Sequence, residues 1–312
     1  AVSLVAAPLL NQLIGVSGIF WLTAILSILA IFVVKYAVPN PVHSHFHSDA
    51  QTAPAKIKDV LRDKQLLRLN FGTFCLHGAQ MAMFIVVPFA LKETSGMNEN
   101  QHWQVYLPVL VASFLLMIPA IIYAEKSAKL KPVFIGAVGL MLAAQLAFAY
   151  SIHTFWGIVA SLFVYFIAFN ILEASLPSLI SKMAPAASKG TAMGVHNTAQ
   201  SFGMFLGATT GGYLSHTIGY SAVFIFCAVL MAIWLGLAFG MNTPPSVKTK
   251  MYHIENVSQQ AAQDLATKIA KITGVREAVA IAAENTLIVK INNQQSKVSL
   301  ANIEQDIIKL IG

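Results

Sequence analysis

The chain has 312 residues, of which 56% are hydrophobic and only 11% are charged, and it carries a formal net charge of +7 at pH 7. A soluble globular domain has about 25% charged residues, so this composition excludes an ordinary water-soluble enzyme. The two cysteines, Cys75 and Cys227, both lie in apolar runs, which excludes a secreted fold built on disulfides. The apolar runs are about 20 residues long, the length of a bilayer-spanning helix, and they predict an integral membrane protein.

In chain order, the hydropathy pattern predicts one partial span and several full ones. A short apolar segment over residues 1–14 precedes a tight turn at 15–18. Full spans are expected at about residues 19–38, 68–91, 105–124, 132–150, 154–180, 191–215 and 220–241. We therefore divide the chain into two helices over residues 1–38, a polar linker over 39–67, a six-helix bundle over 68–243 and a tail over 244–312.

The start of the chain is similar to a later segment. Residues 14–20 and 218–224 share the pattern Ile-Gly-x-Ser-x-(Ile/Val)-Phe, and each copy joins two apolar segments. Chance similarity between two turns is one explanation, and two parallel halves of a duplicated transporter bundle are the other. On the second interpretation, residues 1–14 end the fifth helix of a first half, the bundle is a complete second half, and about four helices precede it.

The polar linker combines two features. Residues 55–67 have a helical apolar face, which predicts a short surface helix. Upstream, His43, His45 and His47 are spaced two apart, so in an extended strand they project to one side and could bind a metal. A solvated, Pro-rich linker explains the same residues. We therefore predict neither a metal site nor a cofactor.

Basic residues predict the orientation of the spans. If the turn at 15–18 lies outside, the inside segments hold residues such as Lys35, Lys126 and Lys182, whereas the outside loops hold Lys92 alone. Lysine and arginine accumulate in cytoplasmic loops of membrane proteins. This rule accounts for the basic balance without nucleic-acid binding, and it places the linker and the tail in the cytoplasm.

The polar tail predicts a small α+β domain. A strand is expected at 248–255, a helix from Ser258 to about 272, a hairpin of strands at 275–283 and 286–291, and a second helix from Ser299. The order β-α-β-β-α is typical of a ferredoxin-like fold without its last strand.

Glu173 is the one carboxylate well inside an apolar run. A charged side chain near the bilayer centre costs roughly 2.5–3.5 kcal/mol, so it is kept where it is paired, hydrated or used. Asn170, one turn earlier, could hydrogen-bond to it, and Pro177, one turn later, loosens the helix around it. We predict that Glu173 is a proton or cation coupling site. The alternative is a structural carboxylate that reaches cytoplasmic water.

Other polar residues within the spans are candidates for lining a substrate cavity, although each could equally bridge helices by hydrogen bonds. They are His77, Gln80, Asn170, His196, Asn197 and Gln200. Gly203, Gly207 and Gly211 recur every four residues and predict close helix packing. The sequence has no nucleotide-binding loop, catalytic triad spacing or His-Glu-x-x-His motif, so it predicts no enzyme, and coupling to an ion gradient is the simpler interpretation.

Three motifs are similar to those of a known transporter family. Residues 170–179 read Asn-Ile-Leu-Glu-Ala-Ser-Leu-Pro-Ser-Leu, followed by Ala-Pro at 184–185 and Lys-Gly-Thr-Ala-Met-Gly-Val at 189–195. Together they resemble the YajR-like branch of the major facilitator superfamily. Residues 6–9, Ala-Ala-Pro-Leu, resemble the end of that superfamily's fifth-helix antiporter motif. The tail resembles the cytoplasmic ferredoxin-like domain of this branch.

The resemblance implies an all-α polytopic helix bundle of major facilitator type, incomplete here, with a small ferredoxin-like C-terminal domain. It further implies a proton-coupled antiporter of the inner membrane that exports drugs or metabolites by alternating access. A small-molecule substrate, protons and the lipid bilayer would be its partners, and the C-terminal domain could bind a ligand or a protein.

Two alternatives to an exporter remain at this point. One is a symporter or facilitator for a small metabolite, and the other is a non-transporting membrane sensor whose tail is the output module. Metal carriage by the tail is not expected. The heavy-metal-associated domains that it resembles hold a Cys-x-x-Cys after their first strand, whereas residues 255–258 contain no cysteine.

Overall fold

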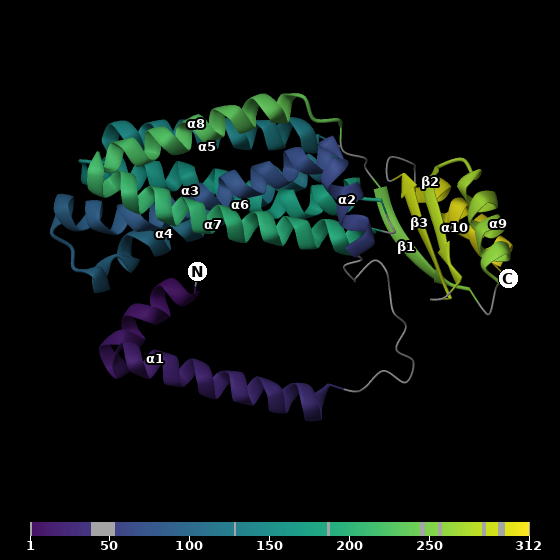
Figure 1. The fold of residues 1–312 in the computed structure, drawn as a ribbon, viewed down its shortest axis with the longest axis horizontal. Coiled ribbons are helices and arrows are strands. Elements are labelled where there is room, and N and C mark those ends of the chain that lie inside the picture. The colour runs from purple at the N-terminus through teal and green to yellow at the C-terminus, as the bar shows by residue number, and fades with distance from the viewer. Residues whose placement is uncertain are drawn as a thin grey trace.

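The computed structural model describes residues 2–38, 54–127, 129–185, 188–243, 247–254, 258–282, 285–292 and 297–311. These residues form a bundle of long helices and a small α+β domain at one end of it (Figure 1). The first helix of the chain runs alongside the bundle.

The long helices occur where the apolar runs predict them. They are α1 (Val2–Ala37), α3 (Lys64–Ser95), α4 (Trp103–Lys126), α5 (Leu130–Ser151), α6 (Phe155–Met183), α7 (Lys189–Thr217) and α8 (Tyr220–Phe239). Six of the described helices are long and apolar enough to cross a membrane, as expected for a protein with several spans. α7 is not among the six, although it has 29 residues, because glycine, serine and threonine replace much of its apolar surface.

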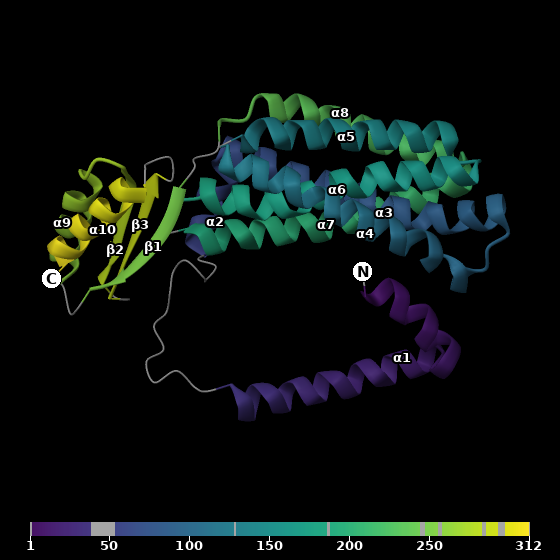
Figure 2. The ribbon, with the colours of Figure 1, turned by 180° about the vertical axis from the view of Figure 1, so that it is seen from behind.

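α1 consists of two helical segments that meet at Gly15. The backbone there has φ 69° and ψ 174°, a conformation that glycine adopts readily and other residues avoid. The turn predicted at residues 15–18 is therefore a kink at one residue. Most side chains beyond the kink are exposed, including Phe20, Trp21 and Phe32, and the helix lies beside the bundle (Figures 1 and 2). Apolar side chains on every side are typical of a membrane helix.

The six helices of the bundle are arranged around α3 and α6. α5 and α8 lie on the side away from α1, whereas α4 and α7 lie nearer to it (Figures 1 and 2). Aromatic side chains join α5 to α8: the rings of Phe148 and Phe224 stack with centroids 4.6 Å apart, and Phe134 meets Trp234 edge-on at 5.9 Å. This packing leaves α3, α4, α6 and α7 to form the part of the bundle that holds the polar residues.

The linker contains the surface helix that the sequence predicts. It is α2 (Pro54–Arg62), and α3 follows it directly. The Asp63 carboxylate caps α3 by accepting hydrogen bonds from the backbone N–H of Gln65, at 2.7 Å, and of Leu66, at 3.2 Å. Because of this cap, α3 begins at Lys64, outside the apolar run that predicts a start at Arg68.

The C-terminal domain has the predicted order of elements. They are β1 (Val247–His253), α9 (Gln259–Ala270), β2 (Val275–Ile281), β3 (Thr286–Asn292) and α10 (Lys297–Ile311). The sheet order is β1-β3-β2, with β3 antiparallel to both neighbours, which is the split βαβ arrangement of ferredoxin-like folds. The Ser258 hydroxyl caps α9 by accepting from the N–H of Ala261 at 3.3 Å. The domain also has a hydrophobic core of its own.

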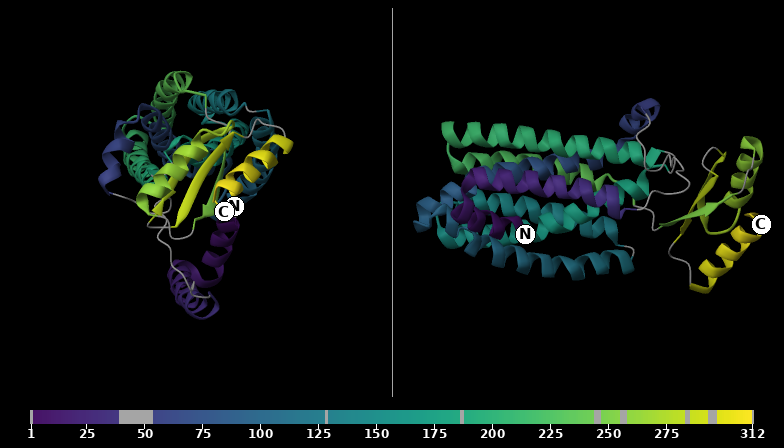
Figure 3. Two further views of the ribbon diagram at one scale, coloured as in Figure 1. Left: turned by 90° about the vertical axis from the view of Figure 1, so that its right-hand side faces the viewer. Right: turned by 90° about the horizontal axis from the view of Figure 1, so that it is seen from below.

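The two faces of this sheet have different neighbours. Leu287 and Val289 belong to the core that α9 and α10 cover, on the side away from the bundle (Figure 3, left). Lys290 points to the opposite face, is only 4% exposed, and donates a hydrogen bond to the carbonyl oxygen of Ala184 at 2.7 Å. Ala184 directly follows α6. The domain therefore contacts the bundle through the sheet face that its helices leave open.

Candidate functional site

A cluster of polar side chains joins α3, α6 and α7 inside the bundle. Its members are Thr73 and His77 on α3, Glu173 on α6 and His196 on α7. Nε2 of His77 lies 3.2 Å from Oε2 of Glu173, and Oγ1 of Thr73 lies 3.0 Å from Nδ1 of His196. Thr73, His77 and His196 are all buried. The cluster thus ties three helices together through polar contacts in an apolar environment.

The tautomer of the His77 ring follows from its second contact. Nδ1 of His77 lies 3.0 Å from the carbonyl oxygen of Thr73, and a carbonyl only accepts, so Nδ1 carries a hydrogen. In the neutral ring Nε2 is then an acceptor, and an ionised Glu173 carboxylate is an acceptor too. A hydrogen bond between them requires one further proton, either on the imidazole or on the carboxyl group. The 3.2 Å contact is therefore a hydrogen bond only when the imidazole or the carboxyl group carries that proton.

The two members of this pair differ in how far the bundle buries them. The His77 side chain is 4% exposed and its ring meets Phe169 edge-on, whereas the Glu173 side chain is 44% exposed. Glu173 therefore lies at the border between the packed interior and the open face of α6.

Asn170 does not support Glu173, contrary to the prediction from their spacing. Its side-chain amide donates to Oγ of Ser113 on α4, at 3.1 Å. The two residues are one helical turn apart, yet each meets a different neighbouring helix. Asn170 also lines a pocket of about 420 Å³ together with apolar residues of α4, Leu110 and Phe114 among them. It is thus placed where a substrate could contact it.

The other predicted cavity residues lie near the cluster but outside its hydrogen bonds. Gln80 on α3 and Gln200 on α7 are half-buried, and Asn197 on α7 is exposed. Two residues were not predicted from the sequence: Thr73, a member of the cluster, and Ser113, the hydrogen-bond partner of Asn170. Thr73 could have been found from its spacing, because it precedes His77 by one helical turn. Serine and threonine are common in membrane helices, so no pattern in the sequence marks Ser113.

The glycine ladder of α7 packs against the backbone of α3. A Cβ atom on Gly203 would collide with the carbonyl oxygen of Phe74, and one on Gly207 with the backbone of Gly78. At Gly211 it would come within 2.9 Å of Cα of Ala82. The absence of these side chains lets the two helices approach closely, which places His196 within reach of Thr73.

The histidines at 43, 45 and 47 lie outside the described residues. Within the part of the chain that the structure describes, no group of three or more His, Cys, Asp or Glu side chains could hold a metal ion.

Comparison with known proteins agrees with this architecture. The family model described as Major Facilitator Superfamily matches residues 1–208 and 111–266. The chain belongs to the Major Facilitator Superfamily. Membership in this family of membrane transporters supports a role in membrane transport, as the sequence predicts, rather than in enzymatic catalysis.

Individual relatives are membrane transport proteins. The chain is 35% identical over 295 residues to the inner membrane transport protein YajR of Escherichia coli K12, an alignment that covers 94% of this chain and 64% of YajR. It is 27% identical over 207 residues to an uncharacterized transporter of Buchnera aphidicola, covering 66% of this chain and 53% of that protein. It is 23% identical over 201 residues to the multidrug resistance protein MdtH of Aeromonas hydrophila, covering 64% and 47%. The chain thus spans about half to two thirds of the length of these curated relatives.

Proposed function

We propose that the protein is a proton-coupled antiporter that exports drugs or metabolites by alternating access. The contact between His77 and Glu173 carries this proposal, because the pair needs one exchangeable proton and Glu173 is half-exposed. In transporters built from two halves, the halves rock around a site near the bilayer midplane. Gln80, Asn170 and Gln200 would line the substrate cavity there, with His196 and Asn197 close by.

Loss of the proton shared by His77 and Glu173 would change how α3 and α6 pack against each other. With the proton present, the 3.2 Å contact between His77 and Glu173 is a hydrogen bond that joins α3 to α6. Without it, the lone pairs of a neutral imidazole nitrogen and of a carboxylate oxygen face each other, and the contact becomes repulsive. Protonation would therefore favour the packed arrangement of the two helices, and deprotonation would favour their separation.

Transport in liposomes tests the proposal. The full-length protein is reconstituted with a pH-sensitive dye inside, and candidate drugs and metabolites are added in the presence of a pH gradient. We expect protons to move opposite to a transported substrate. Movement in the same direction identifies a symporter, and substrate movement without protons identifies a facilitator. If neither protons nor substrate move while the C-terminal domain binds a partner, the protein is a sensor and the proposal is wrong.

We further propose that the protein lies in the inner membrane with its C-terminal domain in the cytoplasm. The name of YajR places that relative in the inner membrane. Lys126 ends α4, Lys182 lies in the last turn of α6 and Lys189 begins α7, so basic residues gather at the bundle end that contacts the C-terminal domain. The positive-inside rule assigns such an end to the cytoplasm.

Cysteine labelling in intact cells checks this orientation. Cys75 and Cys227 are buried, so we expect them to react little with the reagent, and labelling reports on a single introduced cysteine. Lys271→Cys, just after α9, is expected to resist a membrane-impermeant maleimide until the cells are permeabilised. Asn98→Cys, in the exposed connection between α3 and α4, is the matched control and should react from outside. Labelling of Lys271→Cys in intact cells contradicts the proposed topology.

A further inference from the structure

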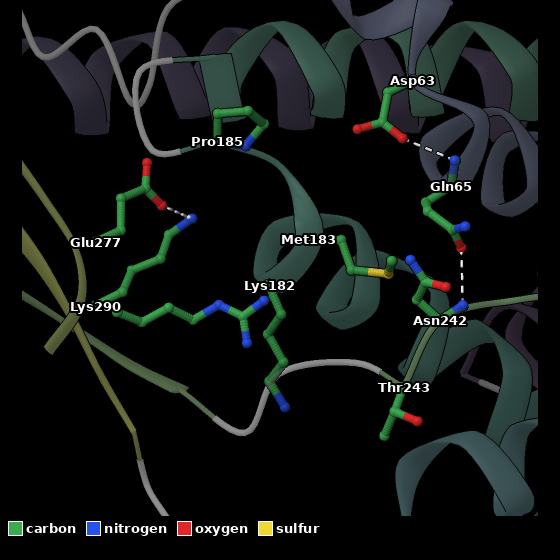
Figure 4. Close-up of a pocket in the computed structure, with 10 residues that line it drawn as sticks. Asp63, Gln65, Lys182, Met183, Pro185, Asn242, Thr243, Glu277 and Lys290 are labelled. Atoms are coloured by element: carbon green, nitrogen blue, oxygen red, sulfur yellow. Dashed lines mark hydrogen bonds and ion pairs between the residues drawn. The ribbon is translucent and has the colours of Figure 1, made fainter. Parts of the chain in front are cut away.

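A polar pocket lies between the helix bundle and the sheet of the C-terminal domain (Figure 4). Its volume is about 400 Å³, within the range of small-molecule sites. Lys290 and Glu277 of the sheet lie on one side of the pocket, and Asp63 and Gln65 at the start of α3 lie on the other. Lys182, from the last turn of α6, also lines it. The pocket exists only where the two parts of the protein meet.

Both carboxylates of this pocket are already engaged. Asp63 accepts the N–H groups of Gln65 and Leu66 as the cap of α3. Oε2 of Glu277 lies 2.8 Å from Nζ of Lys290, whose ammonium group also bonds to the Ala184 carbonyl. These contacts are structural: they hold the helix end and the domain in place. Both carboxylates keep their charge, but within the described part of the chain neither forms an ion pair with Arg276.

Arg276 also lines the pocket and takes no part in these contacts. Strand pairing passes from Val275 opposite Ile291 to Glu277 opposite Lys290, so Arg276 sits in a β-bulge, a feature that re-aims a side chain. The side chain of Arg276 is exposed, lines the pocket, and forms no ion pair with any other residue that the structure describes. Its guanidinium group presents a planar set of donors that matches phosphate and carboxylate oxygens.

Two further donors can act with Arg276. Nζ of Lys182 is held 2.6 Å from Oε1 of Glu125 and keeps two more N–H groups. The Gln65 side-chain oxygen accepts from the backbone N–H of Asn242 at 3.0 Å, which leaves its amide NH₂ as a donor. The pocket thus combines an unpaired guanidinium, an ammonium group and an amide donor.

We propose that this pocket is a binding site for a small phosphate-bearing anion, held by Arg276 and Lys182. A soluble phosphorylated compound and the headgroup of an anionic phospholipid share this chemistry, and the pocket lies at the end of a membrane bundle where both are available. Because its walls come from the bundle and from the C-terminal domain, the bound anion would bridge the two parts. This site is separate from the His77–Glu173 pair and does not depend on the proposed proton coupling.

Binding of pyrophosphate to the full-length protein tests the site. The protein is placed in nanodiscs of phosphatidylcholine, and the affinity is measured by calorimetry. We expect saturable binding that weakens as the salt concentration rises. Arg276→Gln should weaken it about tenfold or more, since a charge-assisted hydrogen bond is lost. Lys182→Gln is a second variant with the same expected direction. Lys271→Gln removes an equal charge from an exposed position outside the pocket and should leave the affinity unchanged.

A second experiment, with an anionic lipid in the nanodiscs, distinguishes a lipid headgroup from a soluble phosphate compound. If nanodiscs containing phosphatidylglycerol raise the melting temperature in an Arg276-dependent manner while pyrophosphate does not bind, the natural ligand is a lipid headgroup. Pyrophosphate binding in neutral discs identifies a soluble ligand. The proposal is overturned if neither probe binds, or if Lys271→Gln weakens binding as much as Arg276→Gln.

Discussion

Glu173→Gln is expected to reduce proton-driven transport by the full-length protein to background, while substrate binding and folding are retained. Glutamine keeps the size of the side chain, and its amide NH₂ can donate to Nε2 of His77, so the link between α3 and α6 survives. What it removes is the exchangeable proton. A pair that cannot lose this proton stays in one arrangement, so the pH gradient no longer drives the change between states.

The measurement is uphill substrate movement in liposomes with an imposed pH gradient, alongside substrate binding to the purified protein. Glu93→Gln is the matched control. The Glu93 carboxylate lies in the last turn of α3 and is exposed. It accepts a hydrogen bond from the Tyr220 hydroxyl at 2.7 Å, and a glutamine side-chain oxygen can accept the same bond. Transport by this variant should be normal. If Glu173→Gln still drives uphill transport at the normal rate, Glu173 is structural and the coupling residue lies elsewhere.

Gly207→Ala is expected to destabilise the bundle more than Gly203→Ala or Gly211→Ala, the same change at the other two glycines of the ladder. The new Cβ would occupy the position of the Gly78 backbone on α3, and a backbone cannot rotate away as a side chain can. Overpacking of this kind costs about 1–3 kcal/mol. We expect the melting temperature in detergent to fall by about 5 °C, on the usual relation between stability and melting temperature.

Gly212→Ala, in the same helix, isolates the packing effect. A Cβ at Gly212 meets no atom within 4 Å, so it adds no contact with a neighbouring helix. Both substitutions gain the same helix propensity, roughly 0.5–1 kcal/mol. The difference between the two melting temperatures therefore measures the contact between α3 and α7. Equal melting temperatures for the two variants would show that the methyl group added at Gly207 does not clash with the backbone of α3. That result would contradict the packing described here.

The sequence by itself determined the elements and their order. Apolar runs predicted the long helices, and α4, for example, extends only two residues beyond its predicted span at each end. The tail's strand and helix order was also predicted, down to the cap of α9 at Ser258. These features depend on neighbours along the chain: hydropathy over a span, periodicity over a few turns, and a capping side chain next to the backbone it binds.

Only the tertiary structure decided which residues meet. Asn170 and Glu173 share a helix and differ by one turn, yet one contacts Ser113 and the other contacts His77. Lys290, whose charge predicts exposure, is buried because the sheet faces the end of α6. Such pairings depend on the rotation of each helix about its axis and on the docking of one domain on another. Both are set by packing of the whole molecule, and no local pattern in the sequence encodes them.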